Sequence, residues 1–275
     1  MNLVYVYDGS PEGFLCCIYE SFARKEIPDD IQTERGQTML GETVRTIRTD
    51  EDISNKVYFS IREKIGSEAQ DFIKKAFLSD LRQKEILLYR LICRGYKRGA
   101  SIFNDLTEDT VYALTTAVRQ IERETHHYLG FIRFSEVRGI LVSEIAPSGR
   151  VLPLVKQHFA DRFPDEVFII MDKTHREALL HRPGQECLFA TVDKDFSVSQ
   201  GDDYRIYEEL WKCFHESISI EQRRNDTCQR NHLPKKFRPY MTEFTVAKSP
   251  QSDFEIPETR SRHRYRRSPL EGRVE

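Results

Sequence analysis

Residues 124–134 read ETHHYLGFIRF, a stretch that combines a carboxylate, two imidazoles, a glycine and an arginine. Before and within it, six residues recur at helical spacing: Leu114, Val118, Ile121, Thr125, Tyr128 and Leu129. We therefore expect a helix that opens near Thr107 and ends at Gly130, because glycine readily takes the left-handed conformation found at helix C-termini. Residues 131–134 are then expected to begin a strand.

Glu124 and His126, in the last turn of this helix, are candidates for an acid–base pair. The partial negative charge at a helix C-terminus favours protonated imidazole. Glu124 with His127, and Glu122 with His126, are spaced to meet on the helix surface. A proton-transfer site could be built in this way. The alternative is a charged helix end that only positions the strand after it.

Length and composition are those of a globular protein. The 275 residues are 39% hydrophobic and 31% charged, which allows one large or two small domains. No segment approaches the roughly 18 apolar residues of a membrane helix. The first residues, MNLVYVYDGSPEGF, carry acids where a signal peptide has basic residues. These features predict a cytoplasmic protein without membrane contact.

The cysteine pattern predicts reduced thiols and no metal or cofactor. Neither a CxxC pair nor a disulfide, zinc or cysteine-ligated iron–sulfur spacing is visible in the sequence. The formal net charge of −2 excludes a general electrostatic attraction to nucleic acid, so such binding must come from local patches. The six cysteines are Cys16, Cys17, Cys93, Cys187, Cys213 and Cys228.

The opening segment predicts a strand, a turn and a helix. Residues 3–7 are rich in β-branched and aromatic side chains, and Asp8-Gly9-Ser10 can form a turn that caps the following helix. Such a helix N-terminus can receive an anion, although the segment lacks the lysine of a Walker loop and a full GxGxxG pattern. Asp8 is therefore either a turn and capping residue or a third catalytic candidate placed at a strand end.

Between residues 50 and 98 the apolar spacing is helical, and a bundle is expected. Its second helix carries a basic stripe that is either a solvated face or a phosphate-contacting surface. The basic residues are Arg82, Lys84, Arg90, Arg94, Lys97 and Arg98.

After Gly130 the pattern predicts strands in hairpins with helices on one side. Asp172 and His175, at the end of one strand, are open to either a functional or a turn role. The strands are expected at residues 131–134, 139–145, 167–172, 178–181 and 187–192, with helices at 151–163 and 203–220.

The sequence therefore predicts an α+β fold: an N-terminal strand–helix unit and a helical bundle packed on an antiparallel sheet with helices on one face. Residues 1–247 are expected to form a single globular unit, with a helical subregion at 50–129 and an α+β subregion at 130–245. Residues 248–275 are expected to be a disordered basic tail.

The segment at 223–238, RRNDTCQRNHLPKKFR, has six basic residues against one acid, Asp226. Basic side chains can neutralise phosphates, amides can reach sugars or bases, and an aromatic ring can stack on an unpaired base. The alternative is a solvated basic loop. The candidate nucleic-acid contacts are Arg223, Arg224, Asn225, Gln229, Arg230, Lys235, Lys236, Phe237 and Arg238, together with Arg133 as an anion clamp.

Five segments of the chain resemble a bacterial family labelled, from gene context and domain fusion, as proteins of DNA metabolism or repair. The resemblance spans residues 1 to about 245. The segments are VYDGSPEGFL, ETHHYLGFIRF, LPLVKQHFADRFPDEVFIIMD, YEELWKCFHESISI and RRNDTCQRNHLPKKFR.

In that family, members are typically encoded beside a radical SAM protein, and in some the same region is fused to a uracil-DNA glycosylase-like domain. The resemblance implies a stand-alone member. The matching positions are Asp8, Gly9, Gly13, Phe14, Glu124, His126, Gly130, Phe131, Arg133, Phe134, Arg224, Asn225, Gln229 and Pro234, whereas His127 lies outside the pattern.

Three functions remain open from the sequence. The first is an accessory protein of DNA repair or modification that binds single-stranded or distorted DNA weakly, a radical SAM partner enzyme, or both. The radical chemistry would belong to the partner, because this chain has no CxxxCxxC motif. The second is an enzyme that uses Glu124, His126 and Asp8, and the third is a structural protein-interaction module.

Overall fold

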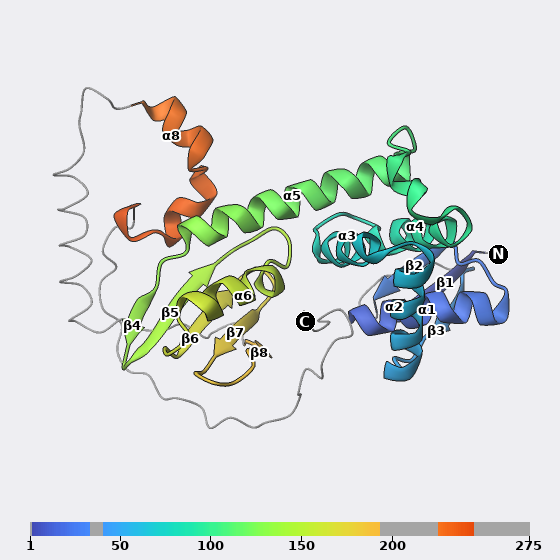
Figure 1. Cartoon of the computed structure of the whole chain (residues 1–275), viewed down its shortest axis with the longest axis horizontal. Coiled ribbons are helices and arrows are strands. Elements are labelled where there is room, and N and C mark those ends of the chain that lie inside the picture. The colour runs from blue at the N-terminus through green and yellow to red at the C-terminus, as the bar shows by residue number, and fades with distance from the viewer. Residues whose placement is uncertain (1, 34–40, 193–224, 245–275) are drawn as a thin grey trace. The chain divides into compact units, whose positions relative to one another are not determined.

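The fold is taken from a computed structural model, which describes residues 2–33, 41–192 and 225–244 (Figure 1). These residues belong to two compact units, one ending at Arg123 and one beginning at Glu124. In the described ranges no helix is long and apolar enough to cross a membrane, and the five cysteines found there are all free. The helix predicted at 203–220 and the tail at 248–275 lie outside the described residues.

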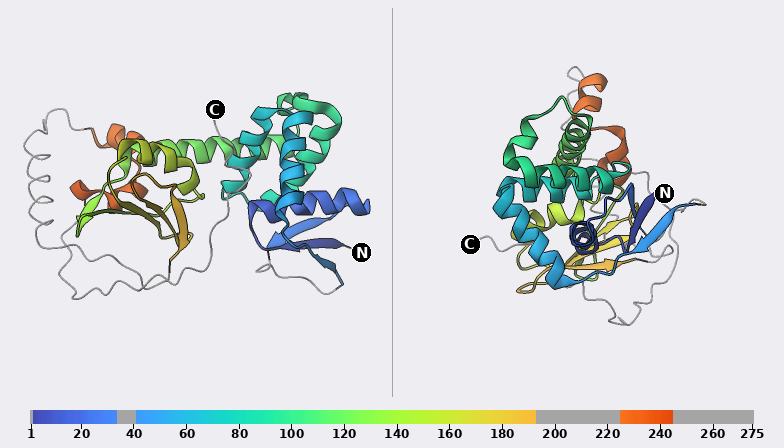
Figure 2. Two further views of the ribbon diagram at one scale, coloured as in Figure 1. Left: turned by 60° about the horizontal axis from the view of Figure 1, so that its bottom comes forward. Right: turned by 90° about the vertical axis from the view of Figure 1, so that its right-hand side faces the viewer.

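The first unit is built on a three-stranded parallel sheet. β1 (Leu3–Tyr7) is its central strand and pairs with β2 (Asp30–Thr33) on one side and β3 (Thr43–Thr46) on the other. α1 (Pro11–Arg24) follows β1 and lies against one face of the sheet (Figure 2). The N-terminal strand and helix are as predicted. β2 and β3 were missed, because each has only four residues and β3 is largely exposed.

Helices complete the first unit and supply most of its core. Tyr5, Phe14, Leu88, Ile92 and Leu114 are among its buried residues and belong to one hydrophobic cluster. The elements are α2 (Glu51–Lys64), α3 (Ser67–Leu78), α4 (Lys84–Arg98), η1 (Gly99–Asn104) and α5 (Asp109–Phe131), the last of which continues into the second unit.

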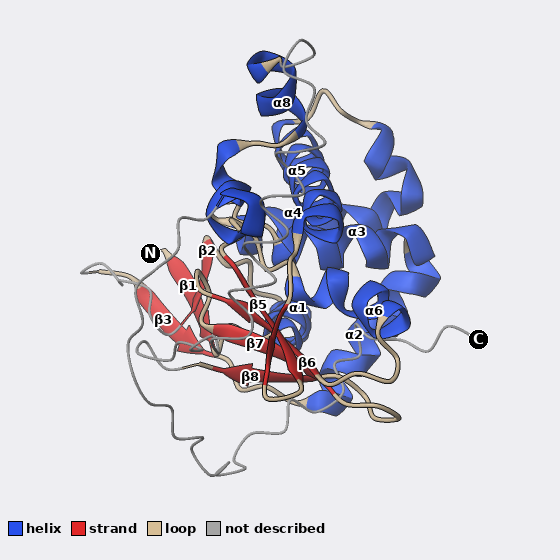
Figure 3. Cartoon of the chain, turned by 90° about the vertical axis from the view of Figure 1, so that its left-hand side faces the viewer, coloured by secondary structure: helices blue, strands red, loops and turns tan. Residues whose placement is uncertain are grey.

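The second unit contains a five-stranded sheet in the order β4-β5-β6-β7-β8, and β5 to β8 carry labels in Figure 3. The strands are β4 (Ser135–Val137), β5 (Ile140–Ile145), β6 (Phe168–Asp172), β7 (Glu177–His181) and β8 (Leu188–Thr191). The helices described here are α6 (Leu152–Arg162), α8 (Asp226–His232), η3 (Lys235–Tyr240) and η4 (Thr242–Phe244).

The α+β class is confirmed, but the sheet is mixed rather than antiparallel. β5 and β6 are parallel, with Ile145 opposite Asp172, while the other neighbouring pairs are antiparallel. α6 explains this difference, because it carries the chain back across one face of the sheet between two strands that run the same way (Figure 2). The first unit's helices also have a sheet of their own, which the sequence did not predict.

The end of α5 differs from the prediction. Gly130 is not left-handed, and the helix continues through Phe131, with the backbone N–H of Ile132 bonded to the carbonyl of Tyr128 at 3.1 Å. The strand expected at 131–134 begins instead at Ser135. Arg133 satisfies the helix end, since its guanidinium donates to the carbonyls of Gly130 and Ile132.

Candidate functional site at the carboxyl ends of β5 and β6

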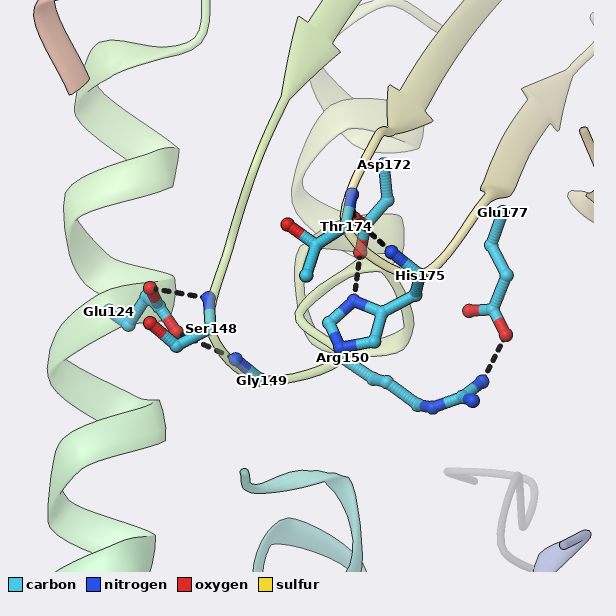
Figure 4. A network of polar contacts seen from close by, with 8 residues as sticks. All are labelled: Glu124, Ser148, Gly149, Arg150, Asp172, Thr174, His175 and Glu177. Atoms are coloured by element: carbon cyan, nitrogen blue, oxygen red, sulfur yellow. Dashed lines mark hydrogen bonds and ion pairs between the residues drawn. The ribbon is translucent and has the colours of Figure 1, made fainter. Parts of the chain in front are cut away.

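Polar side chains gather where β5 and β6 end. Because the two strands are parallel, the loop after β5 and the turn after β6 leave the sheet at the same edge. This edge is where ligands commonly bind in sheets with a helical crossover between parallel strands. The residues there are Ser148, Gly149 and Arg150 in the loop before α6, and Asp172, Thr174, His175 and Glu177 around the β6–β7 turn (Figure 4).

Asp172 is buried and fixes His175. One carboxylate oxygen accepts the backbone N–H groups of Thr174 and His175 at 2.9 and 3.0 Å, and the other lies 2.6 Å from His175 Nδ1. With Nδ1 directed at a carboxylate, the ring orientation is set and Nε2 is left for another partner. No residue of the described ranges hydrogen-bonds to that nitrogen.

Glu177 holds Arg150 in a second ion pair at this edge. Glu177 lies opposite Asp172 in the β6–β7 register, so two carboxylates are neighbours. Burial raises the pKa of Glu177, and the Asp172 charge adds to this rise, while Arg150 and His175 oppose it. The Arg150 guanidinium therefore offsets part of the repulsion between two neighbouring carboxylates.

Glu124 on α5 holds the loop before α6. Its carboxylate accepts the backbone N–H groups of Ser148 and Gly149 at 3.0 and 3.1 Å (Figure 4), and Lys236 Nζ of η3 lies 2.6 Å away. Burial alone would raise the pKa of Glu124, but the Lys236 and backbone hydrogen bonds outweigh it and lower the pKa. Glu124 is thus an ionised, fully engaged structural carboxylate.

Three carboxylate contacts share one feature: the carboxylate side chain is less exposed than the nitrogen-bearing side chain that it contacts. The exposed side-chain fractions are 43% and 21% for Arg150 and Glu177, 18% and 0% for His175 and Asp172, and 48% and 8% for Lys236 and Glu124. Within each of these pairs, the nitrogen-bearing side chain is therefore the more exposed partner. Within the described ranges, no group of three His, Cys, Asp or Glu residues is arranged to hold a metal ion.

The predicted Glu124–His126 pair does not form. Glu124 is buried and His126 is exposed, because positions two apart on a helix point about 200° away from each other. Glu122 pairs with Lys75, and the ring of His127 stacks on Phe131 at 5.5 Å.

Asp8 belongs to the first unit, whereas Glu124 belongs to the second. The Asp8 carboxylate accepts from the Ser10 backbone N–H and hydroxyl at 2.9 and 2.6 Å, and from the Thr49 hydroxyl at 2.8 Å. Burial would raise the pKa of Asp8, but these hydrogen bonds outweigh it and lower the pKa. The Asp8 carboxylate thus lies at the start of α1, the position where the sequence suggested that an external anion could bind. It stabilises the turn before the helix.

The basic C-terminal segment, residues 225–244, is anchored by an aromatic ring. Phe237 is only 2% exposed, and its ring lies 4.9 Å from Tyr128 and 5.4 Å from Phe131, between centroids. It is therefore a packing residue in this structure, not a ring presented for base stacking. Met241, four residues later, is also buried.

Several of the predicted nucleic-acid contacts have structural partners. Asn225 caps α8, Gln229 accepts from Arg238, and Arg133 pairs with Glu243 as well as with the end of α5. Arg230 and Lys235 are exposed, and Lys236 is half exposed despite its pair with Glu124. Arg223 and Arg224 lie outside the described residues.

Sequence reasoning missed Arg150, Glu177 and the amides of Ser148 and Gly149. The available signal was indirect: Arg150 directly precedes the predicted helix at 151–163, and Glu177 follows a strand end already marked by Asp172 and His175. Only the parallel pairing of β5 with β6 brings these segments together.

Comparison with known proteins assigns a family. A family model described as DUF4130, a domain of unknown function, matches residues 82–243, more than half of the chain. The chain belongs to the DUF4130 family. Glu124, Arg150, Asp172, His175 and Lys236 all lie inside the DUF4130 region, whereas Asp8 lies before it.

Among solved structures, a pGpG-specific phosphodiesterase, PggH from Vibrio cholerae, is similar to this DUF4130 protein with a TM-score of 0.33 and 9% sequence identity. The similarity covers 78% of this chain and 99% of that chain. No curated protein matches the chain significantly.

Proposed function

We propose that the protein is an accessory protein of DNA repair or DNA modification that binds nucleic acid through the C-terminal segment, residues 225–244. The proposal rests on one observation: the segment is anchored by buried Phe237 while Arg230 and Lys235 remain exposed. Basic side chains held on an anchored segment lose less conformational entropy on binding phosphates than they would on a free chain. Single-stranded or distorted DNA is the proposed ligand.

The resemblance to proteins of DNA metabolism supports a role in DNA repair or modification. A radical SAM enzyme is the proposed partner. The partner would carry out the radical reaction, since the chain lacks the CxxxCxxC pattern that binds a radical SAM iron–sulfur cluster. Co-purification of the two proteins, followed by assays on damaged or modified DNA, tests this part of the proposal. A partner that is retained in the absence of DNA binding would favour a protein-interaction module instead.

The salt dependence of DNA affinity tests the DNA-binding part. We expect the double variant Arg230→Gln with Lys235→Gln to flatten the plot of log affinity against log salt by about 1.4, since each phosphate contact to a single strand contributes about 0.7. The matched control is Lys56→Gln with Arg62→Gln on α2, which removes the same charge from exposed positions. Fluorescence anisotropy with labelled single-stranded DNA is the measurement.

A shortened chain that ends at Ala247 lacks the arginine-rich residues 260–267, which could bind any polyanion. DNA binding by this chain can therefore be assigned without a contribution from those residues. If that shorter chain shows no salt-dependent affinity for nucleic acid, or if both double variants change the slope equally, the C-terminal segment is not the binding surface.

A further inference from the structure

Arg150 and His175 are two nitrogen-bearing side chains that lie outside the C-terminal segment. Arg150 comes from the loop after β5 and His175 from the turn after β6, two segments at the same edge of the sheet (Figure 4). Each is held from behind by a deeper carboxylate, Glu177 and Asp172 respectively. These contacts fix both side chains, of which Arg150 is 43% exposed and His175 is 18% exposed.

The free donors of the two side chains suit a tetrahedral oxyanion. A guanidinium has five N–H donors, and the described structure uses only Nη1 of Arg150, toward Glu177. His175 has its Nδ1 on Asp172, so Nε2 is the atom that can donate outward when the ring is protonated. Guanidinium groups bind phosphate oxygens with two parallel hydrogen bonds, which adds geometric selectivity.

Two nearby carboxylates, those of Asp172 and Glu124, are buried and are engaged by donors of the protein itself. Asp172 is fully buried and is satisfied by two backbone N–H groups and the imidazole. Glu124 is equally engaged with Ser148, Gly149 and Lys236. Glu177 is 21% exposed, and its carboxylate is paired with the Arg150 guanidinium.

We propose that Arg150 and His175 bind a phosphate group, with Glu177 and Asp172 as the residues that position them. The ligand class is a phosphate-bearing molecule, either a mononucleotide or the phosphate of a nucleic-acid strand. Both proposed contact residues lie outside residues 225–244, and the proposal does not depend on DNA binding by that segment.

The test follows the imidazole signals of the full-length protein by ¹H–¹⁵N NMR during titration at constant ionic strength. The probes are inorganic phosphate, deoxyadenosine 5′-monophosphate, and one short single-stranded DNA with and without a 5′-phosphate. His175→Gln assigns the signal. We expect a saturable shift of the His175 ring with at least one probe.

Two variants with the same charge change separate a built site from general charge attraction. Arg150→Gln is expected to weaken binding about tenfold, the loss of one charge-assisted contact. Lys173→Gln is the matched control, because Lys173 lies one residue past Asp172, pairs with Glu144, and is about as exposed as Arg150, at 45%. It is expected to change binding less than about twofold, within the usual effect of a surface charge.

The probes also distinguish the sources of phosphate. A preference for the mononucleotide indicates a small-molecule ligand, a preference for the 5′-phosphorylated strand indicates a strand end, and equal binding of both strands indicates the backbone. Absence of a saturable shift with every probe overturns the proposal, as does an equal loss in Arg150→Gln and Lys173→Gln. Should His175→Gln fail to fold, Arg150→Gln still decides the outcome, since that side chain is well exposed.

Discussion

Glu124 connects three parts of the second unit through one carboxylate: α5, the loop before α6, and η3. Hydrogen bonds to an ionised group are stronger than neutral ones, and a buried carboxylate without them would be strongly unfavourable. Glu124 therefore stabilises the fold. It also fixes Ser148 and Gly149, the two residues that precede Arg150.

Replacing Glu124 with Gln should lower the free energy of unfolding by roughly 2 kcal/mol, because the charge-assisted bonds to Lys236 and one amide are lost. The folded-state pKa of Glu124 is below its unfolded value. Its contribution is therefore complete above the unfolded pKa and is lost as pH falls through the folded pKa. We expect the variant to lose less stability than the wild type on acidification, measured by urea unfolding at several pH values.

His126→Ala is the matched test on the same helix turn. Because His126 is exposed, the substitution should change stability by less than about 0.5 kcal/mol. A loss comparable with that of Glu124→Gln would contradict the structural roles assigned to the two residues.

At the scale of elements, two helical glycines should respond in opposite ways to alanine. A Cβ at Gly13 would lie 2.4 Å from Asp8 Oδ1 and 2.7 Å from Thr49 Oγ1, so the hydrogen-bonded turn before α1 must shift. Gly13→Ala should cost about 1 to 3 kcal/mol. Gly130→Ala meets nothing within 4 Å in α5 and should stabilise by up to about 1 kcal/mol through helix propensity.

Thermal unfolding of the two variants measures this difference. Had Gly130 been the left-handed end of α5, alanine there would destabilise instead. A destabilised Gly130→Ala variant would therefore restore the prediction made from the sequence and contradict the helical geometry.

Phe237 should control the attachment of η3. Phe237→Ala removes a ring packed on Tyr128 and Phe131 and should cost about 3 kcal/mol locally. Hydrogen exchange is expected to show loss of protection across η3 with no change in α1 to α4, whereas exposed Lys235→Ala should leave η3 protected. Unchanged protection in Phe237→Ala would mean that other contacts hold the segment.

The sequence predicted the elements whose signal is local. β6 and α6 match their predicted ranges because each has its own periodicity and clear boundaries. The prediction was wrong at residues 131–134, where Phe131 has strand propensity but completes a helical turn, and it missed β2 and β3. Parallel pairing of β5 with β6 was also missed, because hairpin turns on either side suggested an antiparallel sheet.

The candidate site was predictable only where the contacting residues are close together in the sequence. Asp172 and His175 are three residues apart and were recognised as a strand-end pair. Arg150 and Glu177 are 27 apart, and Glu124 and Lys236 are 112 apart, so no local spacing connects them. The buried position of Glu124 and the exposed position of His126 likewise depend on which face of α5 packs, which follows from the tertiary fold.

On the scale of the whole molecule, each unit has a core of its own. Leu88 is fully buried in the first unit and Ile170 in the second. Either residue replaced by Ala should destabilise its own unit by about 2 to 5 kcal/mol. We expect calorimetry to show a separate shift of one transition for Leu88→Ala and of the other for Ile170→Ala. A single transition lowered equally by both would show that the units unfold together.

The long sequence separation around Glu124 also sets an order of events during translation. Every core residue of the first unit precedes Glu124, whereas Lys236 is added 112 residues after it, on the order of 10 s later at ordinary elongation rates. We expect the first unit to fold on the ribosome while Glu124 is still hydrated and the rings of Tyr128 and Phe131 still lack Phe237. A nascent chain at that stage exposes an apolar surface that a ribosome-associated chaperone would bind.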